Sequence, residues 1–268
     1  MLLAKAIDAQ LHRLKNKIQT HSTITSLMPR FYCARPLDIG TTIDLPEDIA
    51  HHVFVLRVQV GDKIELFNGE GGAYIAIVTE IGKKRAMAEV KLHLSEEREL
   101  AFGLNLAQAL PEGSKMDWII EKAIELGVNS IQPLAAQRSV VKLNAERADK
   151  KLRHWQSIIT AASEQCGRNR LAHLSDVLDV QKWLLQQDMH KRILLTPRSE
   201  QSLADWARHH PPQAVTVMVG PEGGFSEAEE NLAIQHGALA LSMGPRILRT
   251  ETAGLSAITI LSSAWGGM

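Results

Sequence analysis

The chain has little cysteine and no net charge, and each absence excludes a class of protein. Its 268 residues include two cysteines, Cys33 and Cys166, too far apart in the sequence to form a metal-binding or disulfide pattern. This cysteine usage is typical of a reduced, cytosolic compartment. We therefore expect a cytoplasmic protein that holds no metal.

Long hydrophobic runs are also absent. No apolar run approaches the length that crosses a bilayer, although 45% of the residues are hydrophobic, so we expect a soluble globular protein without a membrane partner. The 30 basic residues balance the 30 acidic ones. A formal net charge of zero argues against indiscriminate binding of polyanions, but it leaves room for a local basic face.

Three parts follow one another along the chain. Residues 1–27 read as a leader, in which apolar residues repeat at helical spacing among basic ones. This leader is either a product of an upstream start codon, a peripheral helix or a basic arm that contacts RNA, and it lacks the features of a secretory signal. Residues 28–95 contain short strands and a hairpin pattern at 68–72, which predict a small β-barrel domain. A charged linker at 95–99 separates them from residues 101–268.

The region 101–268 alternates short apolar runs with helical patterns, which predicts an α/β domain with a mostly parallel sheet. Its expected strands are 104–110, 131–134, 192–196, 215–219 and 238–243. Its expected helices are 114–127, 145–166, 182–187, 199–208, one from about 227, and 250–264. Ser114, Ser202 and Ser226 are expected N-caps, the last in a capping box with Glu229. The apolar face of residues 255–265 fits either a core helix or a dimer face.

Two of the expected strands end in Gly-Pro and lead into helices. The first loop reads G-P-E-G-G from Gly220, and the second reads G-P-R-I-L-R from Gly244. Glycines there let a ligand approach bare backbone, and loops at the carboxyl ends of parallel strands bind ligands in open α/β sheets. Neither loop matches a phosphate-binding pattern, and Glu222 would repel an anion. The loops are either ordinary βα turns or a ligand site.

The segments G-P-E-G-G-F-S-E-A-E (220–229) and M-G-P-R-I-L-R-T-E-T-A (243–253) resemble the two C-terminal signatures of the RsmE-type 16S rRNA uridine-N3 methyltransferases of the SPOUT superfamily. Residues 162–168 resemble the family's A-x-E-Q-x-x-R motif, and 137–142 resemble its S-E-R-S-V segment, with Gln137 in place of Glu. The resemblance runs from about Met28 to the end. It implies a SPOUT domain with a deep trefoil knot, a PUA-like RNA-binding domain, and a homodimer.

The resemblance also implies that S-adenosylmethionine is the cofactor and that three loops bind it. The implied residues are Leu195, Thr196, Pro197, Val219, Gly220, Pro221, Glu222, Gly223, Gly224, Met243, Gly244, Arg246, Ile247, Leu248, Thr250 and Ala253. A cationic methyl donor does not need a basic pocket, and its adenine can be read by backbone groups.

Methylation at uridine N3 requires loss of the N3 proton. Arg249 could stabilise the resulting anion, and Glu251, Glu222 or Glu164 could accept the proton; the sequence does not choose among these carboxylates. The implied partner is 16S rRNA or the small ribosomal subunit, whose uridine must leave its base stack. The candidate RNA contacts are Arg35, Arg57, Lys83, Lys84, Arg85, Arg138 and Arg168, whereas Arg170 is expected to be solvated.

Three other interpretations remain at this point. A different nucleotide-binding α/β enzyme, such as a reductase, is disfavoured because the dinucleotide fingerprint is missing. A SPOUT methyltransferase could act on another RNA nucleotide. A non-catalytic RNA-binding module would depend on the β domain alone.

Overall fold

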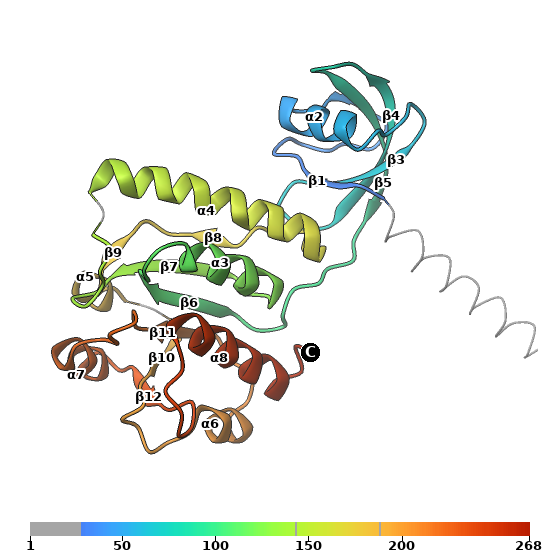
Figure 1. Cartoon of the computed structure of the whole chain (residues 1–268). Coiled ribbons are helices and arrows are strands. Elements are labelled where there is room, and N and C mark those ends of the chain that lie inside the picture. The colour runs from blue at the N-terminus through green and yellow to red at the C-terminus, as the bar shows by residue number, and fades with distance from the viewer. Residues whose placement is uncertain (1–27, 143, 188) are drawn as a thin grey trace, which may run out of the picture. The chain divides into compact units, whose positions relative to one another are not determined.

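The computed structural model describes residues 28–142, 144–187 and 189–268, so the expected leader of residues 1–27 lies outside the described residues. The chain divides into two compact units, the first ending at Glu96 and the second running from Glu97 to Met268. Each unit has a hydrophobic core of its own. Figure 1 shows the first unit in blue to cyan and the second in green to red.

In its described residues, the first unit is a five-stranded sheet with one helix. Its elements are β1 (Arg30–Tyr32), β2 (Thr42–Asp44), α2 (Glu47–Val55), β3 (Lys63–Phe67), β4 (Ala73–Ile81) and β5 (Ala86–Leu94). The strand order is β1-β3-β4-β5-β2, and only β1 and β3 pair in parallel. Between the end strands β1 and β2 the described residues form no ladder, so the hydrogen-bonded sheet is open where the sequence suggested a barrel.

Apolar side chains at alternate positions of the strands build the core of this unit. Ile64 and Leu66 on β3 are fully buried, and they belong to one cluster with Ile49 and Val53 of α2. The short strands of this unit agree with the pattern expected from the sequence. Strand β2 gives no sign in the sequence, because it is three residues long and only its middle side chain is half-buried.

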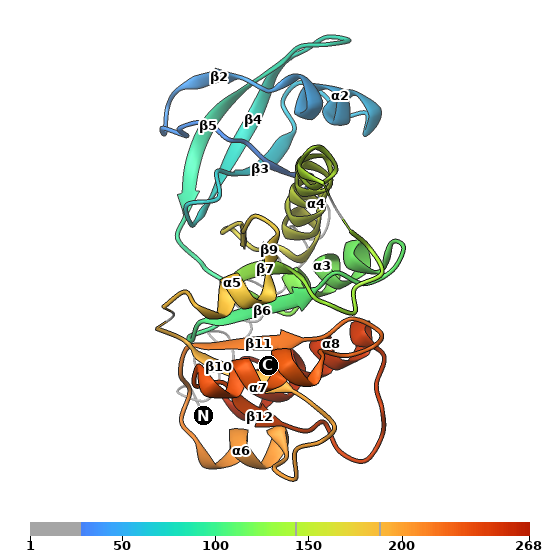
Figure 2. The same ribbon diagram turned by 90° about the vertical axis from the view of Figure 1, so that its left-hand side faces the viewer.

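The second unit is a parallel α/β sheet, as predicted. Its elements are β6 (Leu104–Ala109), α3 (Lys115–Glu125), β7 (Ser130–Ala135), α4 (Ala145–Cys166), β8 (His173–Leu174), β9 (Leu178–Asp179), α5 (Val180–Leu184), β10 (Lys191–Leu195), α6 (Leu203–His209), β11 (Val215–Val219), α7 (Glu227–Gln235), β12 (Leu239–Leu241) and α8 (Thr250–Ala264). The strand order is β12-β10-β11-β6-β7-β8, with β9 also paired to β7 (Figure 2). All of these pairings are parallel.

Helices cover both faces of this sheet, which explains why its central strands are continuous apolar runs. All five residues of β11 are buried. Val215, Val217 and Val219 belong to a core with α3, α4, α6 and α8, whereas Met218 packs with α5 and α7 on the other face. Leu255, Ile258 and Leu261 of α8 lie in the first core. The apolar face of the last helix is therefore a core face and not a dimer face.

The C-terminal chain returns from the edge of the sheet to its middle. Strand β12 pairs only with β10, at the end of the strand order, in the part of the chain that the structure describes. The helix that follows, α8, packs against β11, β6 and α3. A return of this kind is what the predicted trefoil knot requires, and general chain topology makes it rare.

Two of the three expected helix caps are present. Ser202 and Ser226 are extended N-cap residues whose side chains accept backbone N–H groups, and Ser226 forms the full capping box with Glu229. Asn144 caps α4 in the same way, although it was not predicted. The prediction for Ser114 is wrong. It precedes α3 with ψ 9°, not in the extended conformation, and its side chain makes no capping hydrogen bond. Helix α3 owes its position to five buried apolar residues instead: Met116, Ile119, Ile120, Ala123 and Ile124.

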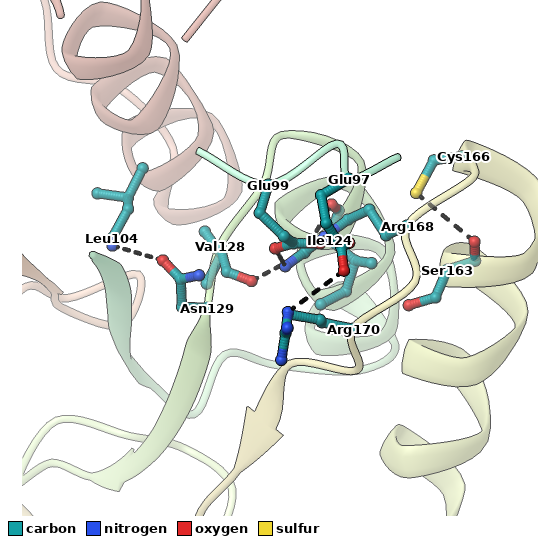
Figure 3. Close-up of polar contacts among 10 residues, drawn as sticks. All are labelled: Glu97, Glu99, Leu104, Ile124, Val128, Asn129, Ser163, Cys166, Arg168 and Arg170. Carbon is teal, nitrogen blue, oxygen red and sulfur yellow. Dashed lines mark hydrogen bonds and ion pairs between the residues drawn. The ribbon is translucent and has the colours of Figure 1, made fainter. Parts of the chain in front are cut away.

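Arg168 is a buried structural residue, which corrects its prediction as an RNA contact. Its guanidinium forms two hydrogen bonds to the carboxylate of Glu99, of 3.0 and 2.5 Å, and donates to the carbonyl oxygens of Ile124 and Val128 (Figure 3). Only 3% of the residue is exposed. Arg168 thus joins the segment before β6 to the end of α3, because a planar guanidinium can satisfy a carboxylate and two carbonyls at once.

We expect Arg168→Met to lower the free energy of unfolding by about 3–5 kcal/mol, since it strands the carboxylate of Glu99 in a largely buried place. The matched control is Arg170→Met. The Arg170 side chain is 54% exposed and lies 3.6 Å from Glu97, so its loss should cost less than about 1 kcal/mol. Urea denaturation measures both variants, and equal losses would contradict the structural role of Arg168.

Candidate active site

Three loops at one edge of the parallel sheet enclose a cavity of about 440 Å³. They follow β10, β11 and β12, whose carboxyl ends meet at this edge because the strands are parallel. Every residue of the three loops implied by the family resemblance lines the cavity, from Leu195–Pro197 through Val219–Gly224 to Met243, Gly244, Arg246–Leu248, Thr250 and Ala253. Loops in this position are where open α/β sheets bind ligands.

Glycines shape the loop after β11. A Cβ on Gly220 would lie 2.8 Å from the Phe225 nitrogen, so no larger residue fits without moving the backbone. Gly224 closes the turn with a hydrogen bond from its N–H to the Pro221 carbonyl, and its φ of 67° favours glycine. A Cβ at Gly224 would meet no atom within 4 Å. The loop therefore presents bare backbone to open space, as a site for a flat ligand requires.

Thr250 ties this loop to the start of α8. Its hydroxyl donates to the Gly220 carbonyl at 2.6 Å and accepts from the Gln108 amide at 2.9 Å. Thr250 is 5% exposed and Gln108 is fully buried. The sequence placed Thr250 in the cavity but gave no sign of Gln108, because a glutamine within a strand carries no pattern that marks its partner.

Glu222 is held in its ionised form. Its carboxylate accepts hydrogen bonds from the Lys115 ammonium at 2.5 Å and from the Glu112 N–H at 3.0 Å. Burial alone would raise the pKa of Glu222, but these hydrogen bonds outweigh it and hold the pKa below its usual range. The hydrogen bond to Glu222 raises the pKa of Lys115 in turn. Sequence reasoning missed Lys115, which lines the cavity from α3.

Two further arginines support the cavity wall. Arg138 donates to the carbonyl oxygens of Gly223 and Phe225, at 2.9 and 3.3 Å. It was predicted to contact RNA, and the structure places it at the cavity, where it braces the glycine loop. Arg198 and the hydroxyl of Thr196 both donate to the carboxylate of Glu230. Neither Arg198 nor Glu230 was among the predicted site residues.

Arg249 and Glu251 stand at the start of α8, on the cavity wall. Arg249 is the N-cap residue and is exposed, as is Arg246 in the same loop. In the described part of the chain neither arginine makes an ion pair with a carboxylate. Glu251 Oε2 is buried and has no hydrogen-bond partner. The cavity wall therefore carries two cations without an acidic partner among the described residues, and a carboxylate with one buried oxygen that accepts no hydrogen bond.

Glu164 does not belong to this site, which corrects its prediction as a catalytic candidate. It lies near the C-terminal end of α4 and is not among the residues that line the cavity. Helix α4 starts at the carboxyl edge of the sheet, after β7, and its 22 residues extend about 33 Å towards the opposite edge. The sequence motif alone made Glu164 a catalytic candidate, and a motif gives no information on the distance between the end of α4 and the cavity.

The RNA-contact candidates of the first unit are all exposed: Arg35, Arg57, Lys83, Lys84 and Arg85. Lys84 and Arg85 pair with Glu47 and Asp44, at 3.6 and 3.2 Å. Arg35 donates to the Asp44 carbonyl, and Arg57 adopts a φ of 56°, unusual for an arginine. The structure gives Lys83 no acidic partner among the described residues.

Among the residues described, no three His, Cys, Asp or Glu side chains form a group that could hold a metal ion. Within the same ranges, no helix is both long and apolar enough to span a membrane. Cys33 and Cys166 are free thiols, and burial raises the pKa of the Cys33 thiol.

Comparison with known proteins gives consistent matches. The RNA methyltransferase domain family model matches residues 98–262, and the RNA methyltransferase PUA domain model matches residues 45–91. The Bacillus subtilis ribosomal RNA small subunit methyltransferase E is 34% identical over 223 residues, covering 81% of this chain and 87% of that protein. Its Buchnera aphidicola counterpart from Acyrthosiphon pisum is 30% identical, covering 89% and 94%.

Solved structures agree with the sequence comparison. The ribosomal RNA small subunit methyltransferase E of Neisseria gonorrhoeae, bound to S-adenosylmethionine, has a TM-score of 0.83 and 38% identity, and the match covers 89% of this chain and 98% of that chain. A Legionella pneumophila protein in complex with S-adenosylmethionine has a TM-score of 0.84 and 35% identity, with the same coverage.

The parallel sheet with its cavity-forming loops, joined to a PUA-like sheet, defines an RNA methyltransferase of the SPOUT type. The predicted SPOUT-type α/β fold with an N-terminal PUA-like domain is thereby confirmed. Within that class, this chain belongs to the ribosomal RNA small subunit methyltransferase E family.

The contact between Thr250 and Gly220 gives a test of the site's architecture. Thr250→Val keeps the shape of the side chain but removes the donor to the Gly220 carbonyl and one of the two acceptors of the Gln108 amide, which keeps its hydrogen bond to the Ala109 carbonyl. We expect the free energy of unfolding to fall by about 1–3 kcal/mol. Thr252→Val, on the exposed side of the same helix, should change it by less than about 0.5 kcal/mol. Urea denaturation compares the two, and an undiminished stability in Thr250→Val would show that this link is dispensable.

Proposed function

We propose that this protein transfers a methyl group from S-adenosylmethionine to N3 of a uridine in the 16S RNA of the small ribosomal subunit. The observation that carries the proposal is the cavity of glycine-rich loops, which joins every residue of the implied cofactor set in one place. The N. gonorrhoeae relative, whose structure contains this cofactor, supports it.

The cavity fits the cofactor in size and chemistry. Its volume of about 440 Å³ lies within the range of small-ligand pockets, about 300–1,000 Å³. Residues 195–197, 219–224 and 243–248, with Thr250 and Ala253, would hold it, mostly through backbone groups near Gly224 and Gly244. When bound, S-adenosylmethionine supplies an electrophilic methyl group on a sulfonium cation. The acidic residues of the wall are compatible with that positive charge.

Arg249 is the residue best placed to stabilise a uridine anion. Its side chain is exposed on the cavity wall at the start of α8 and has no acidic partner among the described residues. A preorganised cation near the developing negative charge lowers the energy of the transition state more than that of the ground state. Arg246, in the same loop, offers a second cation that can meet the RNA backbone.

Glu251 is the best of the three carboxylates to accept the N3 proton. The carboxylate of Glu222 already accepts hydrogen bonds from Lys115 and from the Glu112 N–H, which lower its pKa and therefore its basicity. Glu164 lies outside the cavity. Glu251 lines the cavity and keeps one buried oxygen without a partner. Proton transfer needs an acceptor within hydrogen-bond reach, so the proposal requires the uridine to reach the carboxylate of Glu251 on the cavity wall.

We further propose that Arg35, Arg57, Lys83, Lys84 and Arg85 of the PUA-like unit contact the RNA, and that the protein is a cytoplasmic homodimer. Trp118 supports the dimer, because it is 47% exposed on α3, beside α8. Aromatic residues such as tryptophan are enriched at protein interfaces, so Trp118 is a candidate contact with a second copy. Light scattering on the purified protein gives the mass, and a monomer at micromolar concentration would refute the dimer.

Two experiments test the function itself. Calorimetry should show binding of S-adenosylmethionine and none of a nicotinamide dinucleotide, which a reductase would bind. Mass spectrometry of nucleosides from the ribosomal RNA of cells lacking this protein should show the loss of 3-methyluridine. Loss of a different methylated nucleoside would correct the substrate, and no loss at all would point to a non-catalytic RNA-binding role.

Arg249→Gln should slow methyl transfer about 10²–10³-fold, the effect of removing one donor that stabilises a transition-state anion. The affinity for S-adenosylmethionine should stay within about threefold, because the loss falls on the transition state and not on ground-state binding. Single-turnover methylation and calorimetry measure the two quantities. Unchanged turnover would remove Arg249 from the mechanism.

Glu251→Gln keeps the size of the side chain but removes its ability to accept a proton. We expect a rate reduced about 10²–10⁴-fold at neutral pH. The deficit should shrink as the pH rises, because at alkaline pH the uridine loses its N3 proton without help. Glu227→Gln, the same change at an exposed position on α7, is the control and should leave the rate unaltered. A deficit in Glu251→Gln that is constant with pH would indicate a positioning role instead.

A further inference from the structure

The start of α4 lies at the same edge of the sheet as the cavity. Helix α4 follows β7. This strand runs parallel to β10, β11 and β12, so the carboxyl ends of all four strands lie at the same edge of the sheet. Figure 2 shows α4 nearly end-on. The loop between β7 and α4 also reaches the cavity, through the hydrogen bond of Arg138 to Gly223. A long substrate held at the cavity would therefore pass near the first turns of α4.

The first turns of α4 carry a group of cations, which we name the α4 basic face: Arg147, Lys150, Lys151 and Arg153. Arg147, Lys150 and Lys151 stand three and four positions apart and so share one side of the helix. Arg147, Lys150 and Arg153 are exposed, and Lys151 is half-buried with its ammonium 6.0 Å from the Trp155 ring. Because the whole protein has no net charge, this clustering is a local excess.

None of these four cations makes an ion pair with a carboxylate within the ranges that the structure describes. Helical spacing would allow Glu146 to meet Lys150 and Asp149 to meet Arg153, yet neither pair is formed. Arg147 and Lys151 have no acidic residue four positions away on either side. By contrast, Lys122 on α3 is held by Glu121 and Glu125.

The stability of α4 does not explain this arrangement. Cations stabilise a helix near its C-terminus, where the helix dipole is negative, but the last turn of α4 contains no basic residue. Arg147 lies in the first turn, where the dipole opposes it, and like charges four positions apart, as in Arg147 and Lys151, repel each other. The α4 basic face thus lowers the stability of its own helix, so an external anion accounts for it better.

We propose that the α4 basic face binds phosphate groups of the ribosomal RNA substrate and aligns the strand that leads to the cavity. The inference rests on the proposed function, since it takes the RNA as the partner. On this proposal the α4 basic face positions the phosphate backbone of the RNA, because lysine and arginine on a solvated helix contact phosphates without contacting the bases. The α4 basic face would then act from outside the cavity and leave cofactor binding untouched.

The test is the double variant Arg147→Gln, Lys151→Gln, with an unmodified 16S rRNA transcript as the probe. We expect its Kd at about 0.1 M monovalent salt to rise about tenfold, and the slope of log K against log salt to fall by about 1.4 for two lost contacts to single-stranded RNA. Its thermal midpoint should stay equal or rise, because a like-charge pair is removed. Fluorescence anisotropy and thermal denaturation measure these quantities, and S-adenosylmethionine affinity should be unchanged.

The matched control is Lys122→Gln, Lys182→Gln, which removes the same net charge from α3 and α5. It should leave the RNA affinity within about twofold. The charge-preserving variant Arg147→Lys, Lys151→Arg should bind as the wild type does. Equal weakening by both glutamine variants, or wild-type binding in Arg147→Gln, Lys151→Gln, would overturn the proposal. If the wild-type protein binds the transcript but methylates nothing, the proposed function fails while the α4 basic face is still judged by binding alone.

Discussion

The hydrogen bonds that join Gln108, Thr250 and Gly220 are the interaction on which the cavity depends. They connect β6 in the centre of the sheet, the start of α8 and the loop after β11, three segments distant in the sequence. The hydroxyl of Thr250 donates to one partner and accepts from the other, so a single buried side chain holds both. Helix α8 can return from the sheet edge to this point because its apolar face completes the core against α3, β6 and β11.

Around this link, the charged groups of the cavity divide into two sets. Lys115, Arg138 and Arg198 bind Glu222, backbone carbonyls and Glu230, and so keep the loops in shape. Arg249 and Glu251 make no such contacts in the described structure, which leaves them available for chemistry. A transferase has to orient two substrates, and a rigid cavity wall with a few side chains that are not already paired meets this need.

Several features were readable along the chain because local physics determines them. Ser226 and Glu229 form the predicted capping box, and the range expected for α8 matches the helix. Other features needed partners from far away. Strands β8 and β9 have two residues each, too short for any apolar pattern, and β2 is nearly as short. The sequence motif predicted that Arg168 contacts a phosphate, but its guanidinium is buried and hydrogen-bonds to Glu99 and to two backbone carbonyls. A motif records which residue is present, and the surrounding fold decides whether it faces solvent.

By itself, the sequence determined the order of the longer strands and of the helices in the second unit, the parallel sheet, the family resemblance and the residues of the three loops. Hydrophobic periodicity, glycine turns and capping residues are short-range properties, so they can be read without knowing what lies opposite. Only the tertiary structure decided that Lys115 restrains Glu222, that Glu251 keeps a free oxygen, and that Glu164 and Arg168 lie outside the cavity. These outcomes depend on contacts between residues far apart in the sequence, 107 positions for Lys115 and Glu222, and such contacts exist only once the chain has folded.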